Sequence, residues 1–351
     1  MNLQFYKLND DQENENNNSI KSGYTFLVGI GFLPDDPVQR EIKNLRRHSI
    51  LISVSLIFIM IITSVTRNHY DSLFRFSGFF SSSVFTSIAH MLVVAIAFGI
   101  VILFYTNVMN KKVRLKRQTN QSIRVSFVDI LFYVLIFLGA VCLSKIVTYA
   151  FTHLLEFFHI FPKSHITVLP KTVLEIILYI FSWCIVPCIF EELFFRGVLL
   201  TALRKFGNIF ALLISSILYA LYRGNIAAFP EFFLISFVMG FLAIETNSLL
   251  FPGIMRIVTG VISKLFELPG FKEINLNKIV SYTFIFVLIG ISIISLYLLG
   301  QRQSFCTTTP AKNCSALNMK SKQLIFFTSN SMLLLFIVAL MQFITSVELI
   351  F

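Results

Sequence analysis

The stretch IFEELFFRGV, residues 189–198, ends a long apolar run and places two carboxylates and one guanidinium where membrane hydrocarbon is expected. An ionised side chain near the middle of a bilayer costs roughly 2.5–3.5 kcal/mol on insertion scales. The three charges therefore persist only if they pair with one another or line a wet cavity. On a helix, Glu192 and Arg196 are i,i+4 neighbours with the acid first, which is the favourable order for an ion pair. Glu191 is rotated by about 100° from Glu192 and faces a different neighbour.

The composition of the whole chain is that of a membrane protein. Of 351 residues, 56% are hydrophobic and 13% are charged, and the mean hydropathy is +0.78. Soluble domains carry about 25% charged residues. These values predict an all-α, polytopic membrane helix bundle of about eight or nine transmembrane helices, since one span needs about 20 apolar residues. Nine candidate spans are found at 49–66, 83–106, 126–149, 172–200, 208–223, 228–244, 249–266, 279–299 and 323–347.

The remaining segments complete the predicted organisation. Residues 1–22 include the run NDDQENENNNS, which cannot bury enough apolar surface to fold and is predicted to be a disordered polar tail. No cleavable signal peptide is evident in this polar beginning. Asp36 and Pro37 are typical of the start of a short helix. The predicted divisions are a polar tail (1–22), an interfacial or amphipathic segment (23–48), a transmembrane scaffold (49–150), a core (172–266) and C-terminal transmembrane helices (279–351).

The net charge of +11 is explained by membrane orientation rather than by nucleic-acid binding. Lys and Arg are concentrated beside apolar runs, before residue 49, in 111–124, at 204–205 and in 302–322. The positive-inside rule then predicts a multi-pass protein of the cell membrane with a cytoplasmic N-terminus. The lipid bilayer is its expected partner, and no nucleic acid is expected. The Asn- and Lys-rich tails suggest an AT-rich bacterial genome.

Spacing alone predicts that Glu191 meets Arg223. The turn between the fourth and fifth candidate spans falls near Phe206, 15 residues after Glu191 and 17 residues before Arg223. In an antiparallel helix pair these two residues lie at similar depth. The fourth span is long enough to tilt or to break at Pro187.

Two cysteines and a carboxylate could in principle hold a metal. Cys184, Cys188 and Glu192 follow one another at single-turn spacing. We favour packing of small residues between helices and expect no metal or other cofactor. An imidazole from elsewhere in the chain, such as His90, would change this interpretation if it lay beside the acidic pair.

The stretch FEELFFRGVLL, with Glu191, Glu192 and Arg196, resembles the first signature of the CPBP family, the membrane-embedded CAAX-processing and bacteriocin-processing (Abi-type) proteases. The resemblance extends over about residues 173–263. The second family motif is an aromatic residue, three positions and a histidine, and here Tyr219 is followed by Arg223. The third motif is a histidine, three positions and an asparagine. At those positions the chain carries Arg256 and Gly260.

The resemblance implies roles that this chain fills only in part. In the family, the first glutamate is thought to activate water, the histidines assist it or bind a metal, and the asparagine stabilises the oxyanion. Arginine keeps its proton in proteins and has no lone pair for a metal, and glycine has no side-chain donor. A nearby guanidinium also stabilises the charged form of Glu191 and makes it a weaker base. The exchanged residues therefore favour a charge cluster over a protease centre.

We thus predict an intramembrane-protease fold that is catalytically inactive, a pseudoenzyme. Glu191, Glu192 and Arg196 would form a buried ion-pair cluster with Arg223 and Arg256. A membrane-bound peptide or protein is the expected partner, and an immunity or regulatory role is expected. Three alternatives stay open: a cluster that only locks helices together, an active CAAX-type or leader-peptide endopeptidase with Glu191 as general base and zinc as cofactor, and an anion-binding or transport protein.

Overall fold

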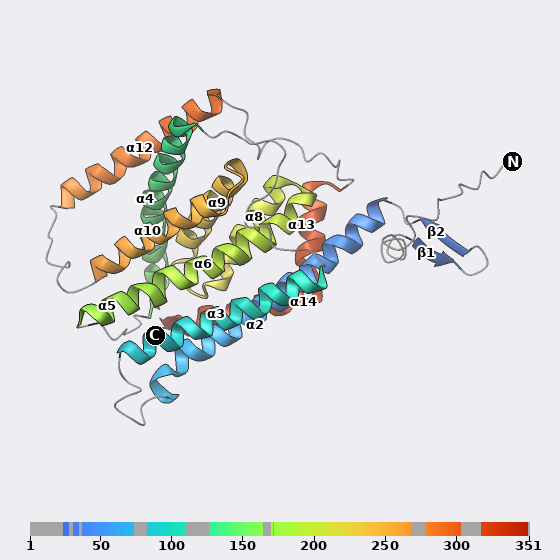
Figure 1. The fold of residues 1–351 in the computed structure, drawn as a ribbon, viewed down its shortest axis with the longest axis horizontal. Coiled ribbons are helices and arrows are strands. Elements are labelled where there is room, and N and C mark those ends of the chain that lie inside the picture. Colours follow the sequence, from blue (N-terminus) through green and yellow to red (C-terminus); the bar gives the residue numbers. More distant parts are fainter. Residues whose placement is uncertain are drawn as a thin grey trace.

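The computed structural model describes residues 24–27, 31–34, 37–73, 83–109, 126–163, 170, 172–267, 278–302 and 317–349. The predicted tail 1–22 lies outside these residues. The described part is a bundle of helices with two short antiparallel strand pairs, so the predicted all-α membrane fold is confirmed (Figure 1). The N-terminal helices are α2 (Pro37–Leu73), α3 (Ser83–Val108) and α4 (Phe127–Phe157). The strand pairs are β1 (Tyr24–Leu27) with β2 (Gly31–Pro34) and β3 (Ile160–Pro162) with β4 (Val347–Leu349).

The core and the C-terminal part contribute the remaining helices. A continuous helix from Val173 to Phe206 contains α5 (Val173–Ile180), α6 (Val186–Glu192) and α7 (Thr201–Leu203). The helices that follow are α8 (Asn208–Tyr222), α9 (Phe229–Glu245), α10 (Leu250–Glu267), α12 (Lys278–Arg302), α13 (Met319–Phe327) and α14 (Asn330–Thr345). Helices α2, α3 and α14 lie together at one side of the bundle, and α4 and α12 pair at the other (Figure 1).

Five of the described helices are long and apolar enough to cross a membrane, or six if one bent pair is counted. Helices form at all nine predicted places, but α8, with 15 residues, and α9, with 17, are shorter than a full span. The predicted span 323–347 is divided into α13 and α14, which are bent by 71°. The structure is thus a multi-pass membrane bundle. By length and composition, the residues it describes contain fewer full-length spans than the eight or nine predicted, because apolar length along the sequence alone does not distinguish a span from a short buried helix.

The N-terminal region differs from the predicted short helix followed by a separate span. Helix α2 is continuous over 37 residues, from Pro37 through the basic residues to Leu73. No glycine or proline interrupts it after Pro37, so the polar and apolar halves form one rod. The side of the membrane on which its N-terminus lies stays a prediction.

The helix from Val173 to Phe206 does not break at Pro187. A π-helical segment, Phe181–Ile185, precedes the proline, which has no backbone N–H to donate. A second π-helical segment, Leu193–Leu200, begins directly after Glu192. Such widened turns occur frequently at functional sites. They keep the carboxylates and Arg196 on a helix that runs unbroken through the bundle.

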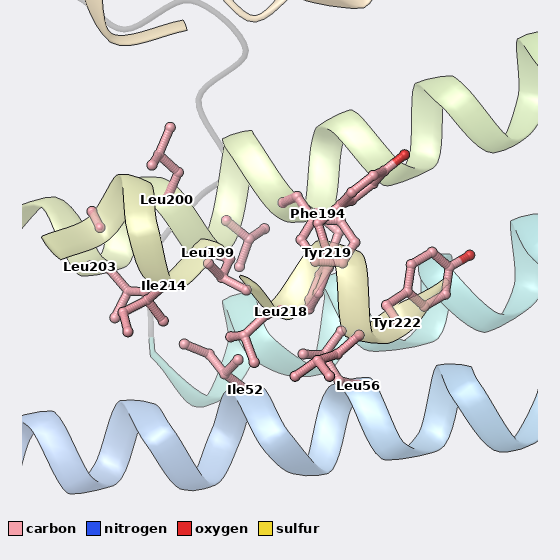
Figure 2. Close-up of a cluster of buried hydrophobic side chains, with 14 of the residues drawn as sticks. Ile52, Leu56, Phe194, Leu199, Leu200, Leu203, Ile214, Leu218, Tyr219 and Tyr222 are labelled. Carbon is pink, nitrogen blue, oxygen red and sulfur yellow. The ribbon is translucent and has the colours of Figure 1, made fainter. Parts of the chain in front are cut away.

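Helix α8 lies at the centre of the hydrophobic core. Most of its residues are buried, among them Ile214, Leu218 and Tyr219. Figure 2 shows Ile52 and Leu56 pointing from α2 toward this cluster. Because apolar side chains surround α8, the polar groups at its C-terminal end must find their partners within the protein.

Candidate functional site: a buried carboxylate–arginine cluster

Three helices bring the charged residues of the site together. The Val173–Phe206 helix supplies Glu191, Glu192 and Arg196, which are only 2%, 5% and 3% exposed. The C-terminal end of α8 supplies Arg223, and α10 supplies Arg256. The ionic residues singled out in the sequence therefore lie near one another, and four of them form two ion pairs, Glu191 with Arg223 and Glu192 with Arg196.

The first ion pair joins Glu191 to Arg223. The Nη2 atom of Arg223 lies 2.9 Å from Oε2 of Glu191. The Tyr219 hydroxyl donates to the same oxygen at 2.8 Å, and the Tyr222 hydroxyl donates to Oε1 at 3.3 Å. Both carboxylate oxygens are thus engaged, and the depth relation predicted from spacing is confirmed.

Tyr219 connects this pair to the third helix. Its hydroxyl accepts hydrogen bonds from Nη2 of Arg223 at 2.9 Å and from Nη2 of Arg256 at 3.4 Å. The guanidinium carbons of Arg196 and Arg223 lie 5.0 and 5.3 Å from its ring centroid, within cation–π range. From the sequence, Tyr219 was predicted only as the aromatic residue of the second family motif. Its spacing of four residues from Arg223 on one helix face was the signal that could have revealed it.

The second ion pair is the one predicted by i,i+4 spacing. Oε1 of Glu192 lies 3.1 Å from Nη1 of Arg196. Nη2 of Arg196 also donates to the hydroxyl and to the carbonyl oxygen of Ser236 on α9, at 3.1 and 3.3 Å. Ser236 was not among the predicted site residues. Arg196 therefore ties the Val173–Phe206 helix, called the central helix below, to α9 as well as neutralising Glu192.

One carboxylate oxygen of this second pair lacks a hydrogen-bond donor among the described residues. Oε2 of Glu192 is buried and has no hydrogen-bond partner in the described part of the chain. The backbone of α10 lies beside it: a Cβ on Gly253 would stand 4.0 Å from Cγ of Glu192. A buried carboxylate oxygen without a donor costs free energy, so the charge on Glu192 depends mainly on Arg196.

Arg256 stands apart from the two pairs. It forms no ion pair with any carboxylate that the structure describes, and its contact with the cluster is the 3.4 Å bond to Tyr219. Two glutamates and three arginines give the cluster a net charge of +1 when all are ionised. The excess positive charge therefore lies on the α10 side.

A family model matches this part of the chain. It matches residues 173–262, called the Rce1-like segment below. The model is described as type II CAAX prenyl endopeptidase Rce1-like, and the matched segment begins with the central helix and ends within α10. The resemblance inferred from the EELFFRG motif is therefore confirmed for this Rce1-like segment. Among the curated proteins and the solved structures that were compared, none matches.

Cys184 and Cys188 pack against α10. In the ranges that the structure describes, no group of three or more His, Cys, Asp and Glu residues is placed to hold a metal. The Cys188 thiol donates to the Gly253 carbonyl at 3.7 Å. The thiol of Cys184 lies 3.8 Å from where a Cβ of Gly260 would stand. These contacts are those of small residues packed between helices.

The imidazole of His90 does not lie beside Glu191 and Glu192 but contacts Ser182 and Trp183. Its Nδ1 lies 3.0 Å from the Ser182 carbonyl, and its ring stacks on Trp183 with centroids 4.0 Å apart. Trp183 precedes Glu191 by two turns, which corresponds to roughly 12 Å along the helix axis. The imidazole that could have replaced the missing family histidines is therefore held elsewhere.

Removing the Tyr219 hydroxyl tests its role as the connector. We expect Tyr219→Phe to lower the free energy of unfolding by about 1.5–3 kcal/mol, because the hydroxyl bonds to three charged groups. Tyr222→Phe, which loses one 3.3 Å bond to Glu191, is the matched control and should cost less than about 1 kcal/mol. Unfolding in detergent can be followed by the fluorescence of Trp183, the only tryptophan. Equal losses in the two variants would contradict the connecting role.

Proposed function

We propose that this membrane CAAX-protease-like protein is catalytically inactive and acts by binding a membrane-embedded peptide or protein. The single observation that carries the proposal is the engagement of Glu191. Arg223 lies 2.9 Å from one oxygen, and tyrosine hydroxyls donate to both. A general base must instead offer a lone pair to a water molecule and hold the proton it takes.

The rest of the site supports the same proposal. At the family's histidine positions stand two guanidiniums, which neither accept protons nor bind metals. At the family's asparagine position stands Gly260, which offers no side-chain donor to an oxyanion. A single oxyanion donor can contribute about 2.7–4 kcal/mol to lowering a reaction barrier. The chain thus has a neutralised carboxylate in place of the base and lacks the family's histidines and oxyanion donor at their expected positions, while it keeps the helices around them.

Binding without cleavage fits a regulatory or immunity role. A fold that keeps the helices around a protease site but not its chemistry can hold a membrane peptide without releasing product. It could thereby withhold that peptide from active enzymes or sense its presence. The bilayer and such a peptide are the partners that we propose.

The test is a peptidase assay on the full chain reconstituted in liposomes. The substrates are prenylated peptides ending in a CAAX sequence and leader peptides, each labelled for fluorescence release, with and without added zinc. We expect the wild type and Glu191→Gln, which keeps the shape of the side chain, to show the same background rate. Hydrolysis by the wild type that Glu191→Gln abolishes would overturn the proposal in favour of an active endopeptidase.

Anion binding is the second candidate, and Arg256 favours it. This cation within the Rce1-like segment pairs with no described carboxylate, and intramembrane arginines mark anion pathways. Under this candidate, vesicles containing the protein take up chloride or phosphate, and Arg256→Gln abolishes the uptake. Arg302→Gln, at the end of α12, is the matched control. Uptake that is absent, or that Arg256→Gln leaves unchanged, would exclude this candidate.

A further inference from the structure

The first turns of α2, far in sequence from the carboxylate–arginine cluster, line an open cavity with basic side chains. The cavity has a volume of about 530 Å³ and is lined by Gln39, Lys43, Arg46 and Arg47 on its polar side. Ile42, Ile50 and a neighbouring leucine line its apolar end. Its size falls within the range of about 300–1,000 Å³ that is typical of small-ligand pockets.

The positive charges at this cavity are not neutralised within the described chain. Lys43, Arg46 and Arg47 are exposed, and none of them forms an ion pair with a described carboxylate. Arg47 donates one long bond of 3.4 Å to a backbone carbonyl of α3. Glu41, the nearby acid on α2, interacts electrostatically with Lys322 on α13. Like charges three or four residues apart destabilise a helix, so this face gains from a bound anion.

An apolar stripe continues from the cavity along the same helix. Ile50, Val54, Phe58 and Ile61 are 48%, 47%, 39% and 49% exposed and follow one another at helical spacing. They lie in the part of α2 that is long and apolar enough to span a membrane. Their exposed surface therefore faces acyl chains. The basic cavity stands where this lipid-facing stripe ends.

We propose that the cavity binds the headgroup of an anionic phospholipid, whose acyl chains lie along the stripe from Ile50 to Ile61. The phosphate would be held by Arg46 and Lys43, since a guanidinium offers paired donors to phosphate oxygens and an ammonium adds a compact charge. Charge at one end and exposed hydrocarbon at the other are complementary to a lipid rather than to a soluble phosphate. The site requires the N-terminal end of α2 to lie at a membrane surface, on either side. This lipid site is independent of the function proposed for the carboxylate–arginine cluster.

The test compares lipid binding to the full chain by native mass spectrometry in detergent. Phosphatidylglycerol and phosphatidylcholine with the same acyl chains are titrated separately. We expect tighter binding of phosphatidylglycerol, and we expect Lys43→Gln/Arg46→Gln to weaken that binding by about 25-fold, about fivefold for each lost cation. The control Lys163→Gln/Lys320→Gln removes the same charge from exposed positions on other elements and should leave the affinity unchanged.

Several outcomes would overturn the proposal. Equal binding of the two lipids would exclude a headgroup site, and equal weakening by both double variants would reduce the effect to net charge. Displacement of the lipid by equimolar inorganic phosphate would assign the cavity to a soluble anion. The fluorescence of Trp183 during thermal unfolding verifies that each variant is folded. If the double variant does not fold, Lys43→Gln alone is used, with an expected weakening of about fivefold.

Discussion

Arg196→Ala is expected to lower the free energy of unfolding by about 3–5 kcal/mol, which is the cost of breaking a buried ion pair by removing one partner. Arg196 is 3% exposed and holds Glu192 at 3.1 Å. Oε2 of Glu192 already has no hydrogen-bond partner in the described residues, so the variant would leave a buried carboxylate almost without stabilising contacts. The bonds of Arg196 to Ser236 on α9 would be lost as well.

Two further variants separate charge from packing. Glu192→Leu/Arg196→Met removes both charges and keeps similar volumes, and its stability should return to within about 1 kcal/mol of the wild type. Arg302→Ala breaks the more exposed contact with Asp129, at 3.7 Å, and should cost only about 0–1 kcal/mol. Detergent unfolding curves followed by Trp183 fluorescence provide the measurement. If Arg196→Ala costs as little as Arg302→Ala, the pair does not stabilise the fold.

The second large effect is expected for Glu191→Ala, at about 3 kcal/mol of unfolding free energy. The variant removes the acceptor of Arg223, Tyr219 and Tyr222 at once. Arg223 and Arg256 would then both donate to the neutral Tyr219 hydroxyl, and the nearby negative charge of Glu191 would be gone. The cost lies at the lower end of the range for buried pairs because the Arg223 side chain is 24% exposed and can be partly solvated.

A double-mutant cycle gives this prediction its control. In Glu191→Ala/Arg223→Met the uncompensated charge is gone, so the loss should be smaller than the sum of the two single losses. The same unfolding assay applies to all four proteins of the cycle. Strict additivity would mean that the 2.9 Å contact contributes no coupling energy, and it would remove the physical basis for treating Glu191 as a neutralised carboxylate rather than a base.

The cluster acts as a link between helices whatever else it binds. The Glu191 pair joins the central helix to α8, the Arg196 bonds join it to α9, and Tyr219 reaches Arg256 on α10. Helices in lipid gain little from the hydrophobic effect when they associate, so polar contacts and close packing provide much of the specificity. Helix locking and a retained binding role are therefore compatible functions of the same side chains.

Features that depend on local geometry could be predicted from the sequence. The pair of Glu192 and Arg196 follows from the helical repeat, because residues four apart share a face whatever the surrounding fold. The pairing of Glu191 with Arg223 follows from a fixed rise per residue on both sides of one turn. The need for both pairs follows from the cost of isolated charges in hydrocarbon. The membrane bundle could be predicted from composition, because a chain with few charges and long apolar runs is suited to hydrocarbon.

Features that depend on how helices meet were decided only by the tertiary structure. The length of α2, the 71° bend between α13 and α14 and the short spans of α8 and α9 are not encoded by apolar length. The position of Arg256, bonded to Tyr219 instead of to a carboxylate, depends on how α10 packs against α8. The sequence by itself thus determined that the charges must be paired in a membrane helix bundle. Only the packing of the helices decided the remaining partners, Ser236 for Arg196 and Tyr219 for Arg256, because helices that no single tight turn connects meet at a depth that spacing along the chain does not set.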